Sequence, residues 1–249
     1  MLRIMTTASG IIIGDEILGG KVEDTNAHRL IAVLHEVGVE LVRLVTIGDD
    51  PRAIADEVAR CRRSTDHVIT SGGVGPTHDD RTMEGVALAF GVPVVHHPEL
   101  EQIVRRHFGD RLNDAALKLA EVPQGAGLLA SGDRLLPVVR MENVFILPGI
   151  PQLFEAKLQR VRAELTGTVG VLHSLYLDAD ESTFAEHLTR VDADFPTVRI
   201  GSYPRLDHTD HQVRVTVESR DPAAAGQALQ RLTELIAPSM VVRVVRDES

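Results

Sequence analysis

The chain has 249 residues, which suffices for one large domain or two modest ones. Its 36 acidic and 26 basic side chains give a formal charge of −10, and aromatic residues make up only 3%. This composition argues against a general nucleic-acid binder, which needs a basic surface or aromatic stacking platforms. The single Cys61 excludes an internal disulfide and a cysteine-cluster metal site.

Along the first 165 residues, strand-like and helix-like runs alternate. Short runs rich in Ile, Val and Leu predict strands over 8–14, 39–47, 67–70, 135–140 and 143–147. Apolar residues at helical spacing, and Pro after an Asp cap in one case, predict helices over 26–37, 50–61, 79–90, 100–107, 114–120 and 151–165. This alternation predicts βαβ units, and hence a three-layer α/β fold whose mostly parallel sheet has helices on both faces.

The pattern changes after a Gly-rich stretch at 167–170, so we expect one domain over 1–168 and a second over 169–249. In the second part, strands are predicted over 171–177, 198–203, 212–219 and 240–245. Helices are predicted over 181–191 and 222–236. The order βαββαβ is that of a small ferredoxin-like α+β domain.

Polar segments follow three of the predicted parallel strands. They are Gly14-Asp15-Glu16, Gly48-Asp49-Asp50 and the segment 71–80. In open α/β sheets, ligands bind beyond the carboxyl ends of the strands. The three segments therefore predict a ligand site at one edge of the sheet.

The loop 71–77 carries three glycines just before a predicted helix. Glycine allows close backbone approach to a ligand, and the N–H groups of such a loop can bind an anion. The loop matches neither the Walker A pattern nor the GxGxxG fingerprint. It is therefore either a phosphate-binding loop or a tight turn without a ligand.

Each carboxylate near this loop has two interpretations. Asp79 and Asp80 are placed in the first turn of the helix over 79–90, where Thr77 and Asp80 would form a capping box. Beside an anion loop, the same carboxylates would hold Mg²⁺ together with ligand phosphates. Asp50, before Pro51, is read as a helix cap, which leaves Asp49 as the better candidate for a metal ligand or base.

The next predicted helix begins after Asp24 or Thr25 as the cap, and Asn26 can present its amide to a ligand. The histidines indicate no second site. His96-His97 is interpreted as a surface pair, and His208 and His211 as part of a polar turn. No His-Glu-x-x-His or Gly-x-Ser-x-Gly pattern occurs.

As an ordered set, these motifs resemble the molybdopterin-binding domain family, which includes the molybdenum-cofactor adenylyltransferases. The set consists of Gly14-Asp15-Glu16-Ile17-Leu18-x-Gly20, Asp24-Thr25-Asn26, Gly48-Asp49, Ser71-Gly72-Gly73-Val74-Gly75-Pro76-Thr77-x-Asp79-Asp80-x-Thr82, Pro137-Val138-Val139 and Leu147-Pro148-Gly149-Ile150-Pro151. The resemblance is closest to the branch that holds the N-terminal domains of competence/damage-inducible protein A (CinA) and of eukaryotic FAD synthase.

The resemblance implies a pocket for pterin or nucleotide phosphates and divalent-metal-dependent hydrolysis of a nucleotide pyrophosphate such as ADP-ribose or FAD. It implies Asp49 and Asp80 as catalytic residues, and Asp49, Asp79 and Asp80 as ligands of Mg²⁺, Mn²⁺ or Co²⁺, with no tightly bound cofactor. The implied ligand-binding residues are Gly14, Asp15, Glu16, Asn26, Ser71, Gly72, Gly73, Gly75, Pro76, Thr77, Thr82, Pro148 and Gly149.

Two other functions stay open: a non-catalytic molybdopterin or nucleotide binding module, and adenylyl transfer in molybdenum cofactor biosynthesis. The loop itself contains no Lys or Arg, so the metal would have to neutralise most of the phosphate charge, with Arg81 as the nearest cation. We expect a small-molecule partner and a homo-oligomer, either a dimer or a trimer.

Three departures from relatives are expected. The length leaves no room for the deamidase domain of many competence/damage proteins or for the reductase-like domain of FAD synthases. Ser131-Gly132-Asp133-Arg134 stands where many relatives carry Gly-x-Ala-Pro-Gly, which weakens a transfer of their substrate preference. Because the N-terminus has no signal-peptide pattern and no run reaches about 18 apolar residues, we expect a cytoplasmic protein without a membrane partner.

Overall fold

The computed structural model describes residues 5–129, 136–205 and 210–246. The chain divides into two compact units, with the division after Gly167. The predicted boundary lies one residue later. Each unit has its own sheet and its own buried core, so each is described by itself.

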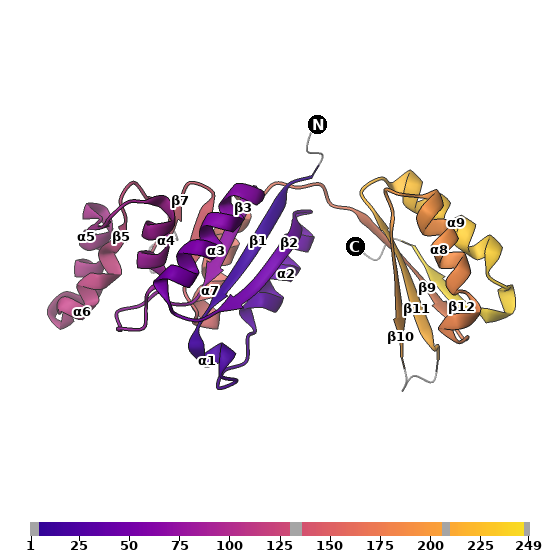
Figure 1. The fold of residues 1–249 in the computed structure, drawn as a ribbon, viewed down its shortest axis with the longest axis horizontal. Coiled ribbons are helices and arrows are strands. Elements are labelled where there is room, and N and C mark those ends of the chain that lie inside the picture. The colour runs from indigo at the N-terminus through magenta and orange to yellow at the C-terminus, as the bar shows by residue number, and fades with distance from the viewer. Residues whose placement is uncertain (1–4, 130–135, 206–209, 247–249) are drawn as a thin grey trace. The chain divides into compact units, whose positions relative to one another are not determined.

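The first unit is built on a six-stranded sheet in the order β2-β1-β3-β8-β7-β6 (Figure 1). Four strands at its centre and one edge run parallel: β1 (Thr7–Ile13), β2 (Glu40–Ile47), β3 (His67–Ser71) and β8 (Val144–Leu147). The other two run antiparallel to their neighbours: β7 (Val138–Met141) and β6 (Gly127–Leu129). The sheet is therefore mixed, with the predicted parallel pairing at its centre.

Helices cover both faces of this sheet, which confirms the predicted three-layer α/β fold (Figure 1). One face packs against α2 (Asn26–Glu36) and α7 (Pro151–Arg162), and the other against α3 (Pro51–Ser64) and α4 (Thr82–Phe90). Strand β8 shows the reason. Its alternate residues enter opposite cores, and all four are buried, so the strand is apolar throughout.

Three short strands were absent from the prediction. β4 (Val94–His96) and β5 (Glu121–Pro123) form a separate two-stranded sheet, and β6 pairs at the edge of the main sheet. Three residues are too few for a hydrophobic period to be recognised. Three further helices complete the unit: α1 (Asp15–Leu18), α5 (Pro98–Phe108) and α6 (Asp114–Leu117), the last followed by the 3₁₀ turn η2 (Lys118–Ala120).

The second unit is the predicted ferredoxin-like domain. Its antiparallel sheet has the order β10-β11-β9-β12. The strands are β9 (Val171–Leu177), β10 (Arg199–Pro204), β11 (Val213–Ser219) and β12 (Val241–Val245). Two helices, α8 (Ala185–Asp194) and α9 (Pro222–Leu235), lie on one face of this sheet (Figure 1). In β11, buried Val213, Val215 and Val217 alternate with half-buried residues, as expected for a sheet covered on one side.

Candidate functional site

The carboxyl ends of the parallel strands meet at one edge of the main sheet, and backbone hydrogen bonds join the segments that follow them. The Gly14 N–H donates to the Ile47 carbonyl over 3.0 Å, and the Gly72 N–H donates to the Leu147 carbonyl over 3.1 Å. The structure therefore brings together the predicted segments after β1, β2 and β3. Pro148, which the resemblance implied as a ligand-binding residue, follows β8 directly at the same edge.

The glycine-rich loop after β3 depends on glycine at its first position. Gly72 has φ +106°, and a Cβ there would collide with the carbonyl oxygen of Ile13. The Thr82 hydroxyl donates to the Gly72 carbonyl over 2.8 Å, and the Thr82 N–H donates to the Gly73 carbonyl over 3.0 Å. The loop is thus fixed against the end of β1 and the start of α4.

The N–H groups at the centre of this loop point to anion binding. No hydrogen bond among the described residues uses the N–H of Gly73, Val74 or Gly75. These three residues also border a cavity in the first unit. Consecutive N–H groups without protein acceptors are the feature by which glycine-rich loops bind phosphate.

Four carboxylates gather on this edge, and we call Asp15, Glu16, Asp49 and Asp79 the acidic cluster. The Asp15 N–H donates to Asp49 Oδ2 over 2.9 Å. Partial burial raises the pKa of Asp49, the Asp15 N–H opposes this, and the charges of Asp15, Glu16 and Asp79 raise it further. A cation at the cluster would relieve this repulsion.

The prediction that Asp79 and Asp80 lie in the first helical turn is wrong, because α4 begins only at Thr82. Asp80 instead closes the preceding turn, where its Oδ2 accepts hydrogen bonds from both the N–H and the hydroxyl of Thr77. The nearby Thr77 hydroxyl also lowers the pKa of Asp79. Arg81 caps α4 without a side-chain hydrogen bond, so the predicted capping box does not form at the helix itself.

The carboxylates proposed as metal ligands do not form a ready metal centre. Within the described part of the chain, no three His, Cys, Asp or Glu side chains are grouped closely enough to hold a metal ion. The metal role of Asp49, Asp79 and Asp80 therefore stays a prediction, and it needs oxygen atoms from a bound ligand to complete the coordination.

Helix capping accounts for two neighbouring carboxylates. Asp50 Oδ1 accepts from the Arg52 N–H over 3.0 Å at the start of α3. Asp24 Oδ1 accepts from the Ala27 N–H over 2.9 Å at the start of α2, which decides between the two caps expected there. The Asp49 side chain caps no helix in the described part of the chain, and its hydrogen bond there is the one it accepts from the Asp15 N–H.

Asn26 joins three segments of the candidate site. Its side chain is only 6% exposed, and its Nδ2 donates to Ser71 Oγ over 2.9 Å and to the Gly149 carbonyl over 2.7 Å. Its buried Oδ1 has no hydrogen-bond partner among the described residues. The amide therefore holds the ends of β3 and β8 to the start of α2, and one acceptor remains unused.

A cavity of about 490 Å³ borders the glycine-rich loop. Polar and charged side chains line part of it: Thr77, His78, Asp80, Arg81, Glu84, Lys118, Glu121 and Lys157. Most of the remaining lining is apolar: Val74, Met83, Val94, Leu100, Leu119, Leu136, Pro137, Val139 and Ile146. A cavity of this size and lining is typical of small-molecule sites.

The sequence analysis missed Lys157. It lies on α7, is only 8% exposed, and its Nζ donates to the Pro137 carbonyl over 2.8 Å. Burial lowers its pKa from the usual 10.5 to about 8. Arg81, the cation expected near the loop, pairs with Glu84 over 2.7 Å. The amino-acid composition could have drawn attention to this residue, because the sequence has only three lysines beside 23 arginines.

Three of the four histidines singled out from the sequence lie within the described residues. His97 caps α5 by accepting from the Leu100 N–H over 3.4 Å, and His96 lies 3.5 Å from Glu121. His211 is buried beside Asp210. His208 and the segment 131–134 lie outside the described residues.

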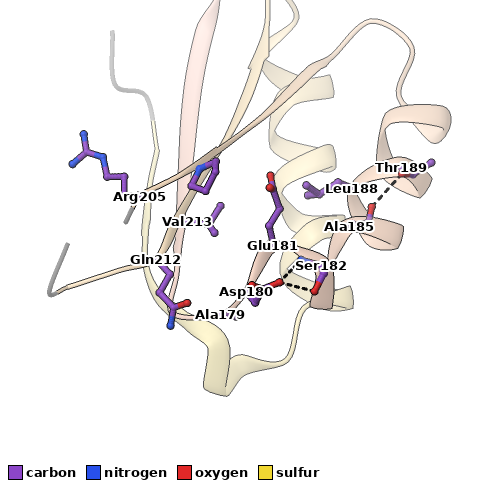
Figure 2. Close-up of a pocket in the computed structure, with 11 residues that line it drawn as sticks. Ala179, Asp180, Glu181, Ser182, Ala185, Leu188, Thr189, Arg205, Gln212 and Val213 are labelled. Carbon is purple, nitrogen blue, oxygen red and sulfur yellow. Dashed lines mark hydrogen bonds between the residues drawn. The ribbon is translucent and has the colours of Figure 1, made fainter. Parts of the chain in front are cut away.

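A second cavity, of about 640 Å³, lies in the C-terminal unit between α8 and the strands β10 and β11 (Figure 2). Several of its polar groups are engaged locally. Asp180 accepts from the N–H and hydroxyl of Ser182, and Gln212 donates to Asp178 over 2.9 Å. It has no glycine-rich loop, so the candidate site is the one in the first unit. No described helix is long and apolar enough to cross a bilayer.

Both units of the chain resemble known protein families. Residues 10–166 match the family described as "Probable molybdopterin binding domain", and residues 171–245 match "FAD synthase, middle domain". The "Probable FAD synthase" of Caenorhabditis elegans is 35% identical over 94% of this chain and 51% of its own length. The chain thus spans about half the length of this relative. A protein of Archaeoglobus fulgidus is 30% identical, over 91% of this chain and 96% of its own length.

Relatives of the CinA branch match as well. A "CinA-like protein" of Myxococcus xanthus is 35% identical over 61% of this chain and 39% of its own length. The crystal structure of CinA from Thermoplasma acidophilum superposes with a TM-score of 0.60 at 29% identity, covering 65% of this chain and 99% of the other. The resemblance drawn from the sequence motifs is therefore confirmed.

Proposed function

Because the chain belongs to the molybdopterin-binding domain family, in the branch of CinA and FAD synthase, we propose that it hydrolyses a nucleotide pyrophosphate such as ADP-ribose or FAD. The reaction would depend on a divalent cation. One observation carries the proposal: the glycine-rich loop, with its unused N–H groups, borders a cavity of ligand size and lies next to the Asp49 carboxylate of the acidic cluster.

The loop is suited to hold phosphate oxygens. The N–H groups of Gly73, Val74 and Gly75 donate to them without giving up any bond made in the described structure. In the transition state, these fixed donors stabilise the charge that develops on the attacked phosphate. Ser71 and Thr82 fix the loop from outside through Asn26 and the Gly72 carbonyl, so they position the loop.

The acidic cluster supplies oxygen ligands for the cation. Asp49 and Asp79 would hold Mg²⁺, Mn²⁺ or Co²⁺ together with the ligand phosphates, and the cation would neutralise phosphate charge and activate water. Asp80 uses only Oδ2 for the Thr77 turn, so its Oδ1 remains available to the same cation. Asp15 holds Asp49 in place through its N–H.

A second function is favoured by one finding. The described carboxylates form no preformed metal site. The loop and cavity would therefore also suit a carrier that binds a nucleotide or pterin without turnover. Adenylyl transfer onto molybdopterin is the third reading, because it uses the same phosphate contacts.

The test is incubation of the pure protein with Mg²⁺, Mn²⁺ or Co²⁺ and ADP-ribose, FAD, or molybdopterin plus ATP. We expect AMP from ADP-ribose or FAD, and none with EDTA. Metal-dependent binding without AMP would leave the carrier function, and adenylated pterin with pyrophosphate would establish transfer. Light scattering of the same sample tests the proposed homo-oligomer.

A further inference from the structure

We propose that the Lys157 ammonium is the anion-binding group at the inner end of the loop cavity, where it receives a phosphate of the nucleotide ligand. This inference rests on the proposed function for the class of ligand. It assigns charge neutralisation to a side chain of α7, more than 70 positions beyond the loop in the sequence.

Among the described residues, Lys157 is a buried cation without a counter-ion. Its Nζ carries three donors, and the Pro137 carbonyl is its one hydrogen-bond acceptor within the described residues. No ion pair in that part of the chain includes Lys157, and burial is the sole cause of its lowered pKa. Burying an ammonium costs several kcal/mol unless an anion is close, so the site is completed by an anionic ligand.

The other titratable groups that the structure describes around the cavity do not supply that anion. Those lining it are His78, Asp80, Arg81, Glu84, Lys118 and Glu121. Glu84 pairs with Arg81, and Asp80 accepts from Thr77. Glu121 lies 3.5 Å from His96 on the neighbouring strand.

The choice of residue type supports a chemical role. The sequence holds 23 arginines and three lysines, and two of those three lysines, Lys118 and Lys157, line this cavity. Lys118 is exposed, whereas Lys157 is buried. A compact ammonium fits a confined site where a planar guanidinium does not, and only the amine changes its charge readily when buried.

The apolar lining identifies the rest of the ligand. Val74, Met83, Leu119 and Ile146 are among the side chains that enclose the cavity, and they suit a flat heterocycle rather than free phosphate. The ligand class is therefore a phosphorylated heterocycle. Its phosphates contact the loop N–H groups and the Lys157 ammonium.

The experiment uses the small number of lysines. Protein labelled with ¹³C-lysine gives three side-chain Cε signals, which Lys21→Arg and Lys118→Arg assign. We expect inorganic pyrophosphate or ADP-ribose, with Mg²⁺, to raise the pKa of Lys157 by one unit or more. The exposed Lys21 is the internal control and should not respond.

Calorimetry provides the second readout. Lys157→Met keeps an unbranched side chain, one atom shorter and without the charge, and we expect it to weaken ADP-ribose binding tenfold or more, while Lys21→Met leaves binding unchanged. Thermal denaturation verifies that both variants fold. If Lys157→Met does not fold, the NMR titration of the unmutated chain decides.

The outcomes separate the two proposals. A Lys157 response without AMP release would support this inference and remove hydrolysis. AMP release, or ADP-ribose binding, with no change at Lys157 would overturn the inference and leave the proposed function standing. Absence of binding of pyrophosphate, ADP-ribose and FAD to the unmutated protein would overturn both.

Discussion

The backbone N–H of Asp15 donates to the Asp49 carboxylate over 2.9 Å, which joins the residue two places after β1 to the residue two places after β2. The bond holds Asp49 among other carboxylates, and burial together with their charges raises its pKa. Such an arrangement is costly without a cation, and carboxylates with perturbed pKa values concentrate at functional sites.

Replacing Asp49 separates its charge from its hydrogen bond. In Asp49→Asn, the amide oxygen can still accept from the Asp15 N–H, but the attraction for a cation is lost. We expect metal-dependent turnover to fall by about 10²-fold or more, with an unchanged or slightly higher melting temperature because one repelling charge is removed. Hydrolysis at saturating substrate and thermal denaturation without ligand measure the two effects.

Asp50→Ala is the matched control. It removes the cap of α3 at a cost of about 1 kcal/mol and should leave the metal dependence intact. Equal loss of turnover in both variants would show that the segment, and not the Asp49 carboxylate, is what matters.

Asp80 accepts hydrogen bonds from Thr77 in the turn before α4, whereas the sequence predicted Asp80 in the first turn of that helix. Asp80→Asn keeps one acceptor for the Thr77 N–H, so we expect a stability loss of at most about 1 kcal/mol. If Asp80 also holds the cation through Oδ1, turnover should fall by about 10²-fold or more. Thr77→Val provides the comparison, because it removes the hydroxyl donor and leaves the charge. A stable Asp80→Asn protein with near-normal turnover would exclude Asp80 from the mechanism.

Local sequence patterns predicted most of the fold, because the core strands and helices are long enough to show a period. The apolar run in β1 and the Asp50-Pro51 start of α3 are examples. The start of α4 was predicted three residues too early, since Asp79 and Asp80 fit a helix start equally well by composition. Only tertiary hydrogen bonds from Thr82 to the loop carbonyls decide where the helix begins.

The strand-end part of the site was predictable for a similar reason. Parallel strands bring their carboxyl ends to one edge, so Gly14, Asp49 and Gly72 had to be neighbours once the strands were recognised. Lys157 was not predictable in this way. It lies inside an ordinary amphipathic helix, and only the packing of α7 against the sheet brings its amine to the cavity.

Gly72 offers a test of the loop geometry. Gly72→Ala places a Cβ against the Ile13 carbonyl oxygen at a φ that disfavours L residues. We expect a stability loss of about 2 kcal/mol or more and loss of ADP-ribose binding, because the backbone must move. Gly127→Ala is the control, since its Cβ meets no atom within 4 Å. Chemical denaturation of both variants measures the difference, and a Gly72→Ala protein as stable as the control would contradict the described loop.

Because its pKa is lowered by burial, Lys157 should make the free energy of unfolding increase with pH. Its pKa is about 8 when folded and near 10.5 when unfolded, so between these values the unfolded chain binds more protons. The free energy of unfolding therefore rises with pH through that interval. Below about pH 8, Lys157 is charged in both states, and the full cost of burying the ammonium destabilises the fold. From pH 7 to pH 10 the unmutated protein should gain roughly 2 kcal/mol relative to Lys157→Met.

Denaturation of the two proteins at each pH measures that difference directly, since other titrating groups are common to both. A bound phosphate should reverse the effect. By favouring the charged amine it raises the pKa, so ADP-ribose affinity should fall as pH rises through about 8 in the unmutated protein, and less so in Lys157→Met. Binding near pH 8 should then take up protons, which calorimetry in buffers of different ionisation enthalpy detects. Identical pH profiles for the two proteins would mean that Lys157 keeps one charge state throughout and takes no part in ligand binding.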